Sequence, residues 1–139
     1  MPEWVFVALG SNLGDREAYL AFARDRLARL PRTELVAQST IEETEPLGPI
    51  VQGPYLNQMV LLKTELSARE LLEACLEIER AAGRERRVRW GPRTLDLDIV
   101  RYGDLIVKES DLVLPHPELE NRPFWQRELA ELAEYVRIP

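Results

Sequence analysis

The sequence has little of several residue types on which function often depends. It contains one cysteine, Cys75, which excludes an internal disulfide and a cysteine-based zinc site. Its only two lysines are Lys63 and Lys108, so chemistry on phosphate groups has to rely on arginine. No apolar run approaches the roughly 20 residues needed to span a bilayer. The strand-like residues 4–9 follow no basic region, so we expect a cytoplasmic protein with no membrane partner.

The charge and length narrow the class of protein further. The net charge of −6 argues against a nucleic-acid-binding protein, because phosphate contacts need a basic surface. A chain of 139 residues, 45% of them apolar, suits one domain over residues 1–139. We therefore expect small-molecule substrates and a monomer, with a dimer as the alternative.

The order of the predicted elements indicates the fold. Apolar spacing and turn residues predict strands at 4–9, 33–40, 55–66 and 95–102, and helices at 16–30 and 67–82. Ser67 and Glu70 form a capping-box pattern at the start of the second helix, and Gly83 suits its end. Proline and glycine predict a loop at 45–54. This β-α-β-β-α-β order predicts an α+β, ferredoxin-like sandwich, an antiparallel sheet with both helices on one face, followed by a short hairpin and a closing helix.

Two aspartates in the last predicted strand carry the strongest chemical signal. Side chains two positions apart share a face of a strand, so Asp96 and Asp98 point the same way. Aspartate is depleted in strands, and two neighbouring carboxylates repel each other unless a cation lies between them. Mg²⁺ prefers carboxylate and phosphate oxygens, so the pair predicts a magnesium site. The alternative is an exposed strand whose aspartates face water.

An arginine-rich segment precedes the two aspartates. It contains the residues Arg84, Arg86, Arg87, Arg89 and Arg93. Such a run is often only a solvated surface, but beside a metal site it is typical of phosphoryl transfer, which depends on positioning and charge neutralisation. The sequence has no Walker-type phosphate loop, so the common nucleotide-binding folds do not apply. His116, the only histidine, is flanked by two prolines and either binds a phosphate or has a structural role.

These motifs together resemble the 6-hydroxymethyl-7,8-dihydropterin pyrophosphokinase family. The resemblance covers nearly the whole chain and is most specific at residues 89–99. The matching segments are residues 8–14 (ALGSNLG), 44–49 (TEPLGP), 55–57 (YLN), 89–99 (RWGPRTLDLDI) and 114–117 (LPHP), with Glu79, Gly83, Arg84, Arg122 and Phe124. It implies an ATP-dependent enzyme of folate synthesis that transfers pyrophosphate from ATP to the hydroxymethyl group of the pterin.

The resemblance also implies roles for individual residues. Asp96 and Asp98 would hold two Mg²⁺ ions, and Arg84 and Arg93 would assist the transfer. The implied ATP-binding residues are Glu79, Arg84, Trp90, Arg93, Ile99, His116 and Arg122. The implied pterin-binding residues are Thr44, Leu47, Tyr55, Asn57, Trp90, Asp96 and Phe124, with the ring stacked between Tyr55 and Phe124.

Two rival functions belong to other classes. The segment 96–100 (DLDIV) fits the pattern of phosphatases that use the first aspartate as nucleophile, but that motif normally follows the first strand of a parallel α/β domain. The second rival is a non-catalytic binding module, since ferredoxin-like sheets also present RNA. The acidic charge and the lack of paired aromatic residues within one sheet strand count against it.

Overall fold

The structure is a computed structural model that describes residues 2–45, 53–83 and 94–136. Its elements follow in the order β1 (Glu3–Ser11), α1 (Arg16–Ala28), β2 (Thr33–Gln38), β3 (Glu42–Thr44), β4 (Tyr55–Thr64), α2 (Ala68–Ala81), β5 (Asp96–Tyr102), β6 (Val107–Lys108), β7 (Val113–Leu114), η1 (Leu119–Asn121) and α3 (Pro123–Ala133). Within this described part, no helix is long and apolar enough to cross a membrane.

The sheet has the antiparallel order of a ferredoxin-like fold. Its central path runs β2-β4-β1-β5, and the short strand β3 pairs with the first part of β4. Strands β6 and β7 form a separate two-stranded hairpin. The predicted α+β fold is therefore confirmed. Strand β3 was not predicted, because its three residues lie in a stretch whose pattern the neighbouring prolines dominate.

The capping residues explain where the first two helices begin. The Asp15 side chain accepts a hydrogen bond from the Ala18 N–H at the start of α1. At the start of α2, Ser67 and Glu70 form the predicted capping box, and the main-chain N–H of Ser67 lowers the pKa of Glu70. Gly83 follows α2 with a φ of +81°, the left-handed conformation that favours glycine.

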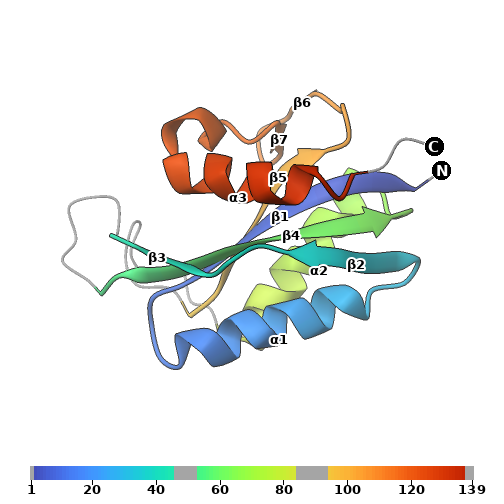
Figure 1. Ribbon diagram of the computed structural model, residues 1–139. Helices are drawn as coiled ribbons and strands as arrows, with labels where there is room; N and C mark the ends of the chain where they lie inside the picture. The colour runs from blue at the N-terminus through green and yellow to red at the C-terminus, as the bar shows by residue number, and fades with distance from the viewer. Residues whose placement is uncertain (1, 46–52, 84–93, 137–139) are drawn as a thin grey trace.

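Helices lie on both faces of the sheet. Figure 1 shows α1 and α2 on one side and α3 on the other. Alternation along β1 sends Val5, Val7 and Leu9 into the core under α1 and α2, and Phe6 and Ala8 into a second core with Trp125 of α3. The two predicted helices share one face, as expected. The predicted closing helix covers the other face and begins at Pro123.

Candidate active site

The two aspartates of β5 lie on the face of the sheet that carries α3. Strand β5 alternates between partly exposed Asp96 and Asp98 and buried Leu97 and Ile99. Leu97 and Ile99 belong to the core under α1 and α2. The sequence-based prediction that both carboxylates share one face is therefore confirmed.

Strand register extends this face into a polar row. Asp96 pairs with Gly10 of β1, Gly10 pairs with Asn57 of β4, and Asn57 pairs with Glu42 of β3. Directly opposite residues in an antiparallel sheet point to the same face. The row therefore brings Asp96 and Asn57, which are far apart in the sequence, to one surface, with only a glycine between them.

Glu79 supports the aspartate strand from the opposite face. Its side chain is buried, with 5% exposure, and its Oε2 accepts a hydrogen bond of 2.8 Å from the main-chain N–H of Leu97. Leu97 separates the two aspartates, so the carboxylate of α2 anchors the strand at the point where they project. The Ile99 side chain lies in the core, and any contact of Ile99 with a nucleotide would be made by its main chain.

The imidazole of His116 is held beside Asp98. Its Nδ1 accepts a 3.0 Å hydrogen bond from the Glu118 N–H, and its Nε2 lies 3.6 Å from Oδ1 of Asp98. The main-chain N–H of His116 donates to the Val100 carbonyl of β5 at 2.9 Å. Since Nδ1 is an acceptor, the neutral ring carries its proton on Nε2. The structure thus joins a predicted phosphate-binding residue to a predicted metal ligand.

Arg122 and His116 share Trp125 as a support. The guanidinium carbon of Arg122 lies 4.4 Å above the centroid of the Trp125 ring, and the His116 ring meets the same indole edge-on, with 4.9 Å between centroids. Trp125 is only 2% exposed. Sequence reasoning missed this role, because an aromatic residue near the start of an amphipathic helix usually signals only core packing.

The predicted pterin-binding residues of β3 and β4 lie together. Asn57 donates from its Nδ2 to Oγ1 of Thr44, and the register places Tyr55 opposite Thr44 on the same face. A Cβ atom built on Gly10 would lie 3.4 Å from Oδ1 of Asn57 and 3.5 Å from Cδ1 of Tyr55. Any larger side chain at this position would therefore contact both residues.

Phe124 lies on α3, the helix that covers this face of the sheet. It is partly buried against the second core, and its ring centroid is 6.4 Å from that of Trp125. Phe124 and Tyr55 thus come from different elements on the same side of the sheet. Whether they hold a ring between them stays a prediction.

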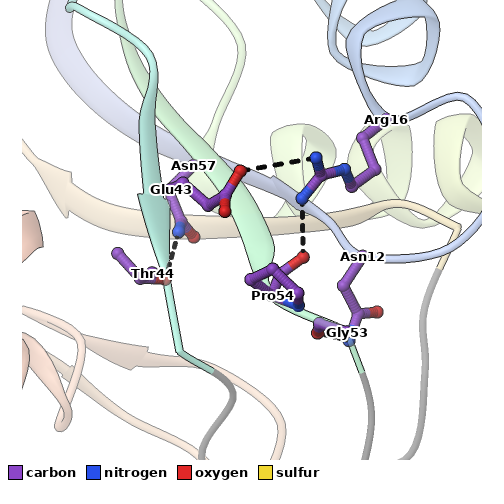
Figure 2. Close-up of polar contacts among 7 residues, drawn as sticks. All are labelled: Asn12, Arg16, Glu43, Thr44, Gly53, Pro54 and Asn57. Carbon is purple, nitrogen blue, oxygen red and sulfur yellow. Dashed lines mark hydrogen bonds and ion pairs between the residues drawn. The ribbon is translucent and has the colours of Figure 1, made fainter.

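A second group of polar contacts fixes the chain on both sides of residues 46–52. Figure 2 shows Arg16, at the start of α1, donating to the Pro54 carbonyl at 2.8 Å and reaching the Glu43 carboxylate at 3.4 Å. Asn12 Nδ2 donates to the Gly53 carbonyl at 3.1 Å. These contacts hold in place the end of β3 that carries Thr44 and the start of β4 that carries Tyr55. Arg16 gave no signal in the sequence beyond its place in the first turn of a helix.

Four predicted site residues lie outside the described residues. They are Leu47, Arg84, Trp90 and Arg93. Their predicted roles stay predictions.

The donors on this face suit magnesium bound together with phosphate. Among residues 2–45, 53–83 and 94–136, no group of three or more His, Cys, Asp or Glu could hold a metal ion by itself. Mg²⁺ usually takes one or two protein carboxylates and completes its coordination with water and substrate phosphates. Asp96 and Asp98 supply that number of carboxylates, with the Asp98 side chain 40% exposed.

Paired carboxylates on a ferredoxin-like sheet, with an imidazole and a guanidinium nearby, are typical of a phosphoryl-transfer class of site. Comparison with known proteins identifies the family. The family model described as 7,8-dihydro-6-hydroxymethylpterin-pyrophosphokinase matches residues 6–134. The chain belongs to this family, and the resemblance seen in its motifs is confirmed.

Its relatives match over most of their length. The chain is 42% identical over 139 residues to a 2-amino-4-hydroxy-6-hydroxymethyldihydropteridine pyrophosphokinase of Pseudomonas aeruginosa, covering 100% of this chain and 86% of the relative. It is 43% identical over 136 residues to a protein of the same name from Bacillus subtilis, covering 98% and 81%. A third relative of that name, from Methylorubrum extorquens, is 44% identical over 128 residues, covering 92% and 81%.

Proposed function

We infer that this chain is an ATP-dependent diphosphokinase of folate biosynthesis. It transfers pyrophosphate from ATP to the hydroxymethyl group of 6-hydroxymethyl-7,8-dihydropterin, giving AMP and the pterin diphosphate. The family match over residues 6–134 carries this conclusion. Neither rival function, the aspartate-nucleophile phosphatase or the non-catalytic module, agrees with that match.

The carboxylate pair is the proposed metal site. We propose that Asp96 and Asp98 hold Mg²⁺, two ions as the family resemblance implies, where the triphosphate of ATP lies. When bound, the metal neutralises phosphate charge and orients the reacting groups. Glu79 contributes indirectly, because its hydrogen bond to the Leu97 N–H holds the strand between the two ligands.

Hydrogen-bond donors on both sides of η1 would bind the triphosphate. His116 presents its Nε2–H beside Asp98, and Arg122 presents a guanidinium already supported by Trp125. A planar guanidinium matches phosphate geometry with two parallel hydrogen bonds. Arg84 and Arg93 are proposed to assist the transfer itself and Trp90 to cover the site, on the family resemblance alone.

The pterin is proposed to bind over the Gly10 position. Tyr55 and Phe124 would stack on its two faces, Asn57 would hydrogen-bond its edge, and main-chain groups near Thr44 and Leu47 would complete the pocket. Supporting this are the absence of a side chain at Gly10, next to Asn57 and Tyr55, and its place in the polar row between Asp96 and Asn57. The hydroxymethyl group would then lie on the side of Asp96, next to the phosphates.

The phosphorus that is attacked and the nucleotide that leaves distinguish this reaction from that of an ordinary kinase. The hydroxymethyl oxygen attacks the β-phosphorus of ATP and loses its proton, the bond between the α–β bridging oxygen and the β-phosphorus breaks, and AMP leaves. The β- and γ-groups travel together. An ordinary kinase attacks the γ-phosphorus and releases ADP.

The nucleotide product therefore tests the function. The protein is incubated with ATP, Mg²⁺ and 6-hydroxymethyl-7,8-dihydropterin, and the nucleotides are resolved by chromatography. We expect AMP to appear only when the pterin is present, in step with the pterin diphosphate. Release of ADP and free phosphate would contradict the assignment.

We further propose that residues 1–139 form one domain that acts as a cytoplasmic monomer.

A further inference from the structure

A buried carboxyl group that the proposed reaction does not use lies on α3. Glu128 is 1% exposed, and neither of its carboxyl oxygens has a hydrogen-bond donor among the described residues. Oε2 of Glu42, on β3, is likewise buried without a partner in that part of the chain. A buried carboxylate without a donor is costly, so these groups require an explanation.

A proton between the two carboxyl groups gives a partner to Oε2 of Glu42 and to one oxygen of Glu128, and it leaves the other Glu128 oxygen uncharged. Arg127 donates to Oε1 of Glu42 from its Nε at 3.0 Å, and its second nitrogen lies 2.9 Å from the same oxygen, which favours a charged Glu42. Burial, then the hydrogen bond and negative charge of Glu42, raise the pKa of Glu128 to about 9. This pKa favours a neutral Glu128 at pH 7, with a proton available for the buried Oε2 of Glu42.

The remaining charges near this pair do not replace the proton. Glu131, on the same helix, raises the pKa of Glu128 further, and Arg127 lowers it. Glu131 itself accepts hydrogen bonds from the N–H and hydroxyl of Thr40, at 3.0 and 3.2 Å.

Charged residues on the other elements lie away from the pair. On the neighbouring strand β4, Lys63 lies at the far end of the sheet over the Trp4 ring, paired in register with Glu34 of β2. Glu120 of η1 is exposed.

The pair connects two walls of the proposed pterin site. Glu42 lies opposite Asn57 in the polar row and two residues before Thr44 on β3. Glu128 lies four residues after Phe124, so both project from adjacent turns on the same face of α3. A contact between Glu42 and Glu128 thus sets how far Phe124 lies from Thr44 and Asn57.

We propose that Glu128 is a positioning residue for the pterin, and that the proton it shares with Glu42 holds the α3 wall of the site against the β3 wall. This rests on the proposed function. When the proton is lost, the partly exposed carboxylate of Glu42 and the buried carboxylate of Glu128 repel each other, the walls separate and the pterin binds poorly. The proposed metal ligands depend less on the pair, because Asp96 and Asp98 lie on β5.

The stability of the protein should follow the same proton. Glu128 has a higher pKa in the folded than in the unfolded chain, so its stabilising effect is complete below the unfolded value, near 4.5, and is lost as pH rises towards about 9. In Glu128→Gln the amide still donates to Glu42 but does not titrate. As the pH rises from 5 to 9, the thermal unfolding midpoint of the wild type should therefore decrease relative to that of the variant.

Pterin binding by wild type and Glu128→Gln, measured by calorimetry between pH 7 and 10, tests the positioning role. The ratio of the two dissociation constants removes the effect of ionisation of the substrate. We expect a ratio near 1 at pH 7 and about tenfold weaker wild-type binding at pH 10, since only about a tenth of the protein then carries a proton with a pKa of about 9. Glu73→Gln, an exposed change on α2, should behave as the wild type.

The outcomes separate this proposal from the proposed function. Normal binding at pH 7 with identical pH profiles for wild type and Glu128→Gln would overturn the positioning role alone. A wild type that binds no pterin at pH 7 would overturn the proposed function and this role with it. An infrared difference spectrum at pH 7 supplies a readout without substrate: a protonated carboxyl band should be present in the wild type and lost in Glu128→Gln, and its absence from the wild type would contradict the shared proton.

Discussion

His116 directs its Nε2 at Asp98, with 3.6 Å between Nε2 and Oδ1, while the Glu118 N–H donates to its Nδ1. This arrangement couples the only histidine of the chain to the strand that carries the proposed metal ligands. It also specifies one tautomer of the neutral ring.

We predict that neutral His116 is protonated on Nε2. Nitrogen-15 NMR distinguishes the two ring nitrogens, and a single histidine leaves no ambiguity of assignment. A protonated Nδ1 in the neutral ring would mean that the Glu118 contact is not formed in solution.

We predict that Asp96→Asn and Asp98→Asn each nearly abolish turnover, by about 10²-fold or more, because each removes a metal-binding charge. Thermal stability should hold or rise slightly, since two like charges no longer repel. Steady-state rates and thermal unfolding measure both effects. Asp104→Asn, an exposed change outside the site, serves as the control. A rate above about a tenth of the wild type in either variant would contradict the proposed metal ligands.

Gly10→Val should weaken pterin binding by at least about tenfold, the cost of losing roughly 1.4 kcal/mol of contact. The new branches would occupy the space between Asn57 and Tyr55. Valine suits a strand, so the fold should persist, and ATP binding should be nearly unchanged. Calorimetry with each ligand checks this. Equal losses for pterin and ATP would show that the variant disturbs the whole site.

Trp125→Leu should raise the KM for ATP more than Trp125→Phe does. Leucine removes the ring under Arg122, a contact worth about 0.5–2 kcal/mol, or about two- to thirtyfold in binding, whereas phenylalanine keeps an aromatic face. Both variants lose buried volume, so thermal unfolding is measured beside the kinetics. Equal KM values for the two variants would argue that Trp125 acts only through packing.

The sequence alone determined much of the fold and the chemical character of the site. Period-two alternation around Asp96 and Asp98, and the capping box of Ser67 and Glu70, are local patterns that need no distant partner. The order of strands and helices then admits few topologies, and the ferredoxin-like sheet is among them. The motif of residues 89–99 was the most specific part of the family resemblance.

Only the tertiary structure decided which distant residues meet. Strand register placed Gly10 between Asp96 and Asn57, and the docking of α3 on the second face put Trp125 beneath Arg122 and beside His116. Glu42 and Glu128 look like ordinary surface acids in the sequence, since glutamate is seldom buried. Their proposed pairing depends on the packing of α3 against the sheet, which buries Glu128 and places the neighbouring Arg127 on Glu42. Side-chain contacts between elements distant in the chain depend on register and helix docking, which local sequence patterns do not encode.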